Sequence, residues 1–240
     1  MAVSKEQFLT VSKKIDQQRF ESRNIAVNKS ASLAYFSYRL KRPLLKRKYN
    51  NFQKDNLDKP WLTPDAIKAL ELLLQATDIG LEYGSGRSTK FFASLLRHLT
   101  SIEHHEGWYE NVKQELNTEE FDNVDYLLKV PKGNVPNVHF SSEKQHFTSE
   151  RDYPIEDSYF QDYIDALDEF PESHFDFALI DGRARRSCSL KAIEKIKPGG
   201  LLVLDNAERV RYAKVHKALT EWDKLFTTTG LTDTVIWRKP

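Results

Sequence analysis

Length, composition and charge narrow the class of the chain before any motif is considered. With 240 residues, 40% of them hydrophobic, the chain can bury a core and form one domain. Because it has one cysteine and no apolar run near the roughly 18 residues of a membrane span, an intramolecular disulfide and a transmembrane helix are excluded, and we expect a cytoplasmic protein.

Residues 1–59 are expected to form a basic helical extension that caps the main domain. Residues 1–50 hold 12 Lys/Arg against 3 Asp/Glu. Helical spacing extends over Lys5–Phe20 and Ser30–Leu45, with apolar residues on one side of the second helix, namely Leu33, Phe36, Leu40 and Leu44. The cluster 39–48 could associate weakly with a surface of phosphate or lipid headgroups, although a solvated cap is the favoured interpretation. Without an aromatic platform or a known motif, no nucleic-acid partner is expected.

The main domain, residues 60–240, is predicted to begin with a helix that is followed by a ligand-binding turn. We call this turn, residues 81–89, the cradle. Thr63 is a candidate N-cap with Pro64 at the first helical position, and the helix continues to about Gln75. An apolar strand then enters the turn Gly84-Ser85-Gly86, and a helix follows. Glycines permit close backbone approach, and free N–H groups at a helix start favour a charged ligand.

Carboxylates end the first two predicted strands of this domain. Glu82 lies at the end of the first strand, and Glu103 ends the strand 99–102, about 20 residues further on. An acid at that distance binds the ribose in nucleotide-binding βαβ units. The pair therefore indicates a nucleotide-like ligand at the glycine turn.

Residues 131–171 form the irregular part of the domain. A third strand, Val124–Val130, precedes them, and they hold four of the nine prolines together with alternating aromatic and charged residues. Because long insertions in compact domains are commonly functional, we expect a lid made of a loop and a helix near Tyr159–Phe170.

The remaining chain alternates strands with helices, which predicts a mainly parallel sheet covered on both faces. One strand ends at Asp181, and the next ends at Asp205-Asn206 after the turn 197–200. A helix near Val210–Trp222 and two strands near Leu225–Thr228 and Thr232–Trp237 complete the chain. Ligands bind beyond the carboxyl ends of such strands, where these polar residues fall.

The ordered motifs resemble class I S-adenosylmethionine-dependent methyltransferases. They are Leu81-Glu82-Tyr83-Gly84-Ser85-Gly86, Ser101-Ile102-Glu103-His104, Leu179-Ile180-Asp181-Gly182, Lys197-Pro198-Gly199-Gly200 and Leu204-Asp205-Asn206. The resemblance implies a doubly wound, Rossmann-like, mainly parallel seven-stranded α/β sheet that ends in an antiparallel hairpin. It implies S-adenosylmethionine as cofactor and these candidate binding residues: Glu82, Tyr83, Gly84, Ser85, Gly86, Ser88, Thr89, Glu103, His104, Trp108 and Asp181.

Asp181, Asp205 and Asn206 further resemble the metal ligands of catechol-type and macrolide-sugar-type O-methyltransferases. Three interpretations compete: they hold Mg²⁺ or Ca²⁺, or Asp181 acts as a metal-free base, or the side chains cap the next helices. The catechol type has a base lysine where this chain has Ala184. Without that lysine, Asp181 itself or a histidine such as His104 would take the proton from the acceptor. Asp181, Asp205 and His104 are therefore the candidate catalytic residues.

Three functions compete for this pattern. The first is O-methylation of a small polar or sugar-like acceptor, including a glycan, which the arginines near Asp181 and Asp205 favour. The second is an NAD-dependent oxidoreductase, because the glycine turn and the distant acid are shared, although Ser88 or Thr89 replaces the third glycine. The third is a non-catalytic binding protein that keeps the fold.

Overall fold

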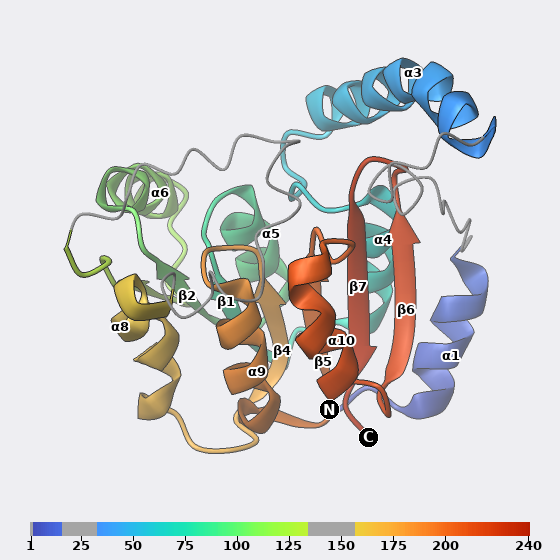
Figure 1. The fold of residues 1–240 in the computed structure, drawn as a ribbon. Helices are drawn as coiled ribbons and strands as arrows, with labels where there is room; N and C mark the ends of the chain where they lie inside the picture. The colour runs from blue at the N-terminus through green and yellow to red at the C-terminus, as the bar shows by residue number, and fades with distance from the viewer. Residues whose placement is uncertain (1, 16–32, 134–156) are drawn as a thin grey trace.

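A seven-stranded sheet forms the centre of the computed structural model, which describes residues 2–15, 33–133 and 157–240 (Figure 1). The strands are β1 (Ile79–Tyr83), β2 (His98–Glu103), β3 (Val124–Leu128), β4 (Phe175–Ile180), β5 (Ile196–Asp205), β6 (Asp223–Thr228) and β7 (Asp233–Arg238). They lie in the order β3-β2-β1-β4-β5-β7-β6. β1 to β5 pair in parallel, whereas β7 runs antiparallel between β5 and β6. The predicted fold class is confirmed.

Helices cover both faces of the sheet (Figure 1). The α-helices are α1 (Lys5–Lys14), α3 (Leu33–Asp55), α4 (Pro64–Leu73), α5 (Arg87–Leu95), α6 (Glu106–Thr118), α8 (Gln161–Ile164), α9 (Arg185–Lys195) and α10 (Ala213–Ala218), and the 3₁₀ helices are η2 (Asp165–Glu169) and η3 (Val210–Tyr212). One apolar cluster joins the sheet to α1, α4 and α5. A second joins the opposite face to α8, η2, α9 and α10. The parallel strands are therefore buried on both sides.

The start of α4 follows the sequence signals closely. Thr63 is the N-cap, and its hydroxyl accepts a hydrogen bond from the backbone N–H of Ala66. Pro64 occupies the first helical position, where a missing N–H costs nothing. Ile67 and Leu70 then point into the core with at most 2% exposure. This helix fixes the chain that enters β1 and hence the cradle.

The N-terminal region meets the domain at two separate places. α1 docks through the buried Phe8, and the carbonyl of Val3 accepts a 2.7 Å hydrogen bond from Arg238 Nε. α3 lies over the carboxyl edge of the sheet (Figure 1), where Tyr49 Oη donates to the carbonyl of Trp61 at 3.2 Å. α3 is longer than the predicted helix and continues through Pro43. None of the described helices combines the length and apolar content that crossing a bilayer needs.

The final part of the expected lid belongs to the core. Tyr163 and Leu167, in α8 and η2, are fully buried against β4 and α9. The rest of the lid prediction falls on residues 134–156, outside the described residues. The expected helix near Val210–Trp222 is also shorter, since η3 and the six-residue α10 replace it.

Candidate functional site

The turn between β1 and α5 requires glycine for a reason that lies in the protein itself. Gly84 has φ of +90°, and a Cβ atom there would lie 2.5 Å from the Cα atom of Gly182. Gly84 N–H also donates to the carbonyl of Ile102 at 2.9 Å. The turn is therefore pressed against the loop that leaves β4, which brings the ends of β1, β2 and β4 together.

Glu82 is a fully buried carboxylate beneath this turn. Its Oε2 accepts hydrogen bonds of 2.6 Å from the hydroxyls of Thr89 and Ser101, and its Oε1 is buried with no hydrogen-bond partner among the described residues. Burial raises the pKa of Glu82 to about 7. A buried carboxylate with an unsatisfied oxygen suits a cationic ligand group, which would restore ionisation and complete its hydrogen bonding.

Glu103 is the second carboxylate, and it is held in one orientation. Its Oε1 accepts from the backbone N–H groups of His104 and His105 at 2.8 Å, and its Oε2 accepts from the N–H and hydroxyl of Ser85 at 3.0 and 2.9 Å. Although burial opposes ionisation, His104 and these N–H groups hold the pKa of Glu103 at about 2. Glu103 is therefore an ionised acceptor beside the glycine turn.

Trp108 forms a half-exposed wall over the same turn. Its Nε1 donates to the carbonyl of Ser85 at 2.8 Å, and its ring lies next to Gly86. At 48% exposure it is not a helix core residue. His105 is the N-cap of α6, with Nδ1 accepting from the N–H of Trp108, whereas the His104 ring packs edge-on against Phe160 and approaches Glu103. An aromatic face beside two carboxylates can bind a flat heterocycle.

Three of the predicted cofactor residues, Tyr83, Ser88 and Thr89, have side chains that are buried within the protein framework. The side chain of Tyr83 points into the core, where Tyr83 Oη donates to the carbonyl of Ile164 at 3.1 Å. Thr89 accepts from the N–H of Gly86 and donates to Glu82, so it joins the turn to the buried acid. Ser88 is nearly buried in the first turn of α5. Tyr83 is thus the predicted residue whose side chain the structure places away from the cradle.

Arg185 occupies the space between the acidic ends of β4 and β5. Its Nε donates to the carbonyl of Gly182 at 2.9 Å, and its Nη2 contacts the carbonyl and Oδ1 of Asp181, both at 2.6 Å. Its Nη1 donates to the carbonyl of Asp205 at 2.7 Å and to Asn206 Oδ1 at 3.4 Å. The guanidinium therefore ties the two strand ends together.

These residues do not fit the predicted Mg²⁺ or Ca²⁺ site. A guanidinium already stands between Asp181 and Asp205, and Asn206 Oδ1 accepts a 2.6 Å hydrogen bond from Arg209. A cation added there would lie against fixed positive charge. Within the described ranges, no cluster of three His, Cys, Asp or Glu side chains has the arrangement of a metal site.

The capping interpretation of the acids is not supported either. Ala184, in the left-handed region at φ of 45°, is the N-cap of α9 and supplies no side-chain hydrogen bond. Asp205 instead accepts from Thr234 Oγ1 at 2.9 Å and from Asn206 Nδ2 at 2.8 Å. Burial, followed by the charge of Asp181, raises the pKa of Asp205 to about 8. These contacts oppose the metal and capping interpretations, and metal-free chemistry at Asp181 stays a prediction.

Sequence reasoning missed three residues that shape the site. Ser101 is paired in register with Glu82 across β1 and β2, so a polar residue inside an apolar strand was an available signal. Tyr126 Oη lies 2.6 Å from Ser85 Oγ, and nothing in the β3 pattern indicated that contact. Arg185 is one of the arginines near Asp181 and Asp205, and a sequence does not show which of several arginines turns inward.

Comparisons with known proteins bear on the fold. No family model and no curated protein matches the sequence. A methyltransferase-like protein from Silicibacter pomeroyi is 24% identical, with a TM-score of 0.52 over 76% of this chain and 89% of that one. A proposed rRNA-methylase from Clostridium thermocellum is 10% identical, with a TM-score of 0.51 over 72% and 93%. These likenesses show a Rossmann-like methyltransferase fold.

One prediction about partners is wrong. No nucleic-acid motif was found in the sequence and no nucleic-acid partner was expected, yet a proposed rRNA-methylase has a similar fold. The absence of a recognition motif was a poor guide, because one fold hosts many unrelated functions and its partners depend on individual sites. The resemblance to divalent-metal O-methyltransferases also finds no support among these structures.

Proposed function

We propose that this chain is an S-adenosylmethionine-dependent methyltransferase. The observation that carries the proposal is the pair of buried carboxylates, Glu82 and Glu103, at the ends of β1 and β2 beside a glycine turn. They lie at the carboxyl edge of a sheet with an antiparallel β7, where open α/β sheets bind ligands.

Each part of the cofactor has a complementary group in the cradle. Glu82 Oε1 would accept a hydrogen bond from the ammonium group of the methionine moiety, Glu103 would accept from the ribose hydroxyls, and Trp108 would pack against the adenine. When bound, the cofactor supplies a methyl group activated by a sulfonium. The task of the protein is then to fix donor and acceptor in line.

Ser85 is the residue that makes room for the ribose. Its hydroxyl lies between Glu103 Oε2, at 2.9 Å, and Tyr126 Oη, at 2.6 Å. Because the Ser85 hydroxyl has one proton and donates it to Glu103, Tyr126 Oη is the donor to Ser85 Oγ. A ribose hydroxyl that donates to Glu103 Oε2 would take the place of the Ser85 hydroxyl, so ribose binding would exchange one hydrogen bond of Glu103 for another.

We propose that Asp181 takes the proton that the methyl acceptor loses. Its side chain is 24% exposed, whereas that of Asp205 is 5% exposed and fixed by Thr234 and Asn206. Asp181 accepts the proton of a hydroxyl acceptor, which makes O-methylation the finer proposal, and Arg185 holds the carboxylate in place. His104, packed against Phe160 beside Glu103, belongs to the cofactor side.

Calorimetry with S-adenosylhomocysteine and its 2′-deoxy analogue tests the cofactor assignment. We expect Glu103→Gln to weaken S-adenosylhomocysteine by roughly 10-fold to 100-fold, as for a lost charged acceptor. The 2′-deoxy analogue should lose less affinity, because one of the two hydroxyl contacts with Glu103 is already missing. Glu110→Gln, an exposed change on α6, is the matched control. If Glu103→Gln weakens the binding of both ligands equally, Glu103 supports only the structure of the loop. If the protein binds NAD and neither of these ligands, the proposal is refuted.

Methyl transfer is then measured with radiolabelled S-adenosylmethionine. The acceptors are RNA and a panel of hydroxyl compounds, each assayed with the wild type and with Asp181→Asn. A hydroxyl acceptor that loses turnover with Asp181→Asn while cofactor affinity is unchanged supports O-methylation. Transfer to a nitrogen of RNA, unaffected by the substitution, would refute O-methylation and leave the cofactor assignment intact.

A further inference from the structure

α3 has two sides of different character, and one of them has no role in the fold described above. Toward the domain, Tyr38 is 6% exposed and Gln53 is 7% exposed. On the opposite side Leu33, Leu40 and Leu44 are 90%, 80% and 68% exposed. Their spacing of seven and four residues places them in one row along a helix. A row of leucines turned away from the core is costly in water.

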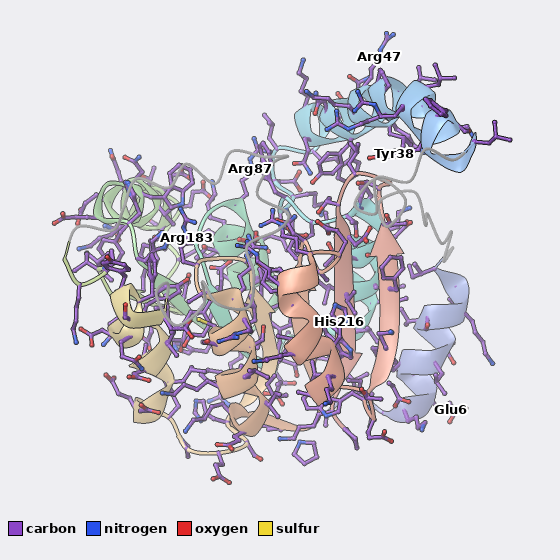
Figure 2. All side chains as sticks on the ribbon, viewed as in Figure 1. Glu6, Tyr38, Arg47, Arg87, Arg183 and His216 are labelled. Carbon is purple, nitrogen blue, oxygen red and sulfur yellow. The ribbon has the colours of Figure 1, made fainter. Side chains whose placement is uncertain are left out.

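The same helix is strongly basic. Residues 33–55 contain seven Lys/Arg and one acidic residue, Asp55, which gives a net charge of +6. Lys41, Arg47 and Lys48 flank the leucine row and are exposed. Figure 2 shows Arg47 on the outer side of α3 and Tyr38 on the side toward the sheet. We call Leu33, Leu40, Leu44, Lys41, Arg47 and Lys48 the outer face of α3.

Charge and hydrophobicity together select one kind of occupant. A second copy of the chain would bring two helices of charge +6 together, which is repulsive. A nucleic acid would satisfy the cations and leave the leucines against phosphates. An anionic bilayer accepts both, since the leucines enter the boundary between headgroups and acyl chains while lysine and arginine meet lipid phosphates.

We propose that the outer face of α3 binds the surface of an anionic lipid bilayer, with the helix lying in the plane of the interface. Leu40 and Leu44 enter the lipid, and Arg47 and Lys48 contact anionic headgroups. Because α3 lies over the carboxyl edge of the sheet (Figure 1), the bilayer would lie on the same side of the molecule as the cradle. The proposal is independent of the chemistry assigned to the cradle.

The test is partitioning of the full chain onto vesicles, measured by co-sedimentation. Vesicles of phosphatidylcholine alone are compared with vesicles that also contain phosphatidylglycerol. We expect binding only to the anionic vesicles, weakened by salt. The double variant Leu40→Gln/Leu44→Gln should bind roughly 10-fold or more weakly, and so should Arg47→Gln/Lys48→Gln. Leu57→Gln, at another exposed leucine, should bind like the wild type.

The variants should fold like the wild type, because glutamine and leucine have similar helix propensities and all four substituted sites are exposed. Folding is nevertheless checked independently. Unchanged thermal unfolding of the variants confirms that only the surface was altered. Three results would overturn the proposal: no binding to anionic vesicles, equal binding with the leucines replaced, or self-association that the leucine variant abolishes. Binding of double-stranded RNA that depends on the cations and not on the leucines, without vesicle binding, would assign this face to nucleic acid instead.

Discussion

Replacement of Glu82 by glutamine tests whether the folded protein without ligand keeps Glu82 protonated, as the raised pKa of this residue indicates. The carboxyl group is fully buried, and Thr89 and Ser101 donate to its Oε2. Its Oε1 has no hydrogen-bond partner in the part of the chain that the structure describes, although the nearby Ser88 hydroxyl also lowers the pKa of Glu82. Burial therefore raises its pKa from 4.5 to about 7. Glutamine keeps the shape and an acceptor oxygen for Thr89 and Ser101, but it does not titrate.

The sign and size of the effect follow from proton linkage. Between pH 4.5 and 7 the folded protein holds a proton on Glu82 that the unfolded chain has released, so stability falls as pH rises through this window. A difference of 2.5 pKa units corresponds to about 3 kcal/mol in total, of which about 2.5 kcal/mol falls between pH 5 and pH 8. The glutamine variant lacks this loss.

The assay is urea denaturation of the wild type and Glu82→Gln at pH 5 and pH 8. The change in unfolding free energy between the two pH values is compared for the two proteins, which cancels every other titrating group. We expect the loss to be smaller by about 2.5 kcal/mol in the variant. Glu110→Gln, an exposed change, should give the wild-type difference. If Glu82→Gln also matches the wild type, Glu82 is already ionised in the folded protein and the reasoning fails.

Further predictions concern the ligand, the glycine turn, and Arg185 with its contacts to the ends of β4 and β5, which we call the arginine clamp. Binding of S-adenosylmethionine at pH 6 should release a proton, detected by calorimetry in buffers of different ionisation enthalpy, and Glu82→Gln should abolish the release. Gly84→Ala should cost about 2–4 kcal/mol of unfolding free energy. Gly133→Ala, also at positive φ but with no described atom within 4 Å of the added Cβ, should cost less, and equal costs would exclude the Gly182 clash. Turnover should persist in excess EDTA, because Arg185 already provides the cation between the acids; loss of turnover that Mg²⁺ restores would contradict this.

The strand pattern predicted the sheet, the glycine turn and the carboxylates at the strand ends because these depend on local periodicity. Glu82, Glu103, Asp181 and Asp205 all lie at the carboxyl edge. Periodicity did not reveal which neighbour each side chain meets. Leu40 was grouped with an apolar helix side, yet that side faces away from the domain, since a helix pattern does not say which side is covered.

Tyr83 and Arg185 also show that a local sequence pattern does not reveal which neighbours a side chain contacts. Tyr83 stands inside the glycine motif, but strand alternation turns its side chain into the core. Arg185 is one of several arginines after Asp181, and it is distinguished by long-range contacts with the end of β5. Such contacts depend on how distant segments pack, which no local window of sequence contains.

The arginine clamp decides how chemistry at this edge is divided among the residues. A guanidinium has five N–H groups, and those of Arg185 have five acceptors, on Gly182, Asp181 (two), Asp205 and Asn206. A divalent cation keeps open positions that bind and polarise an acceptor oxygen, whereas this guanidinium has no donor left for one. Under the proposed function, activation of the acceptor would therefore fall to the carboxylate of Asp181, and Arg185 would act by fixing that carboxylate at the end of β4.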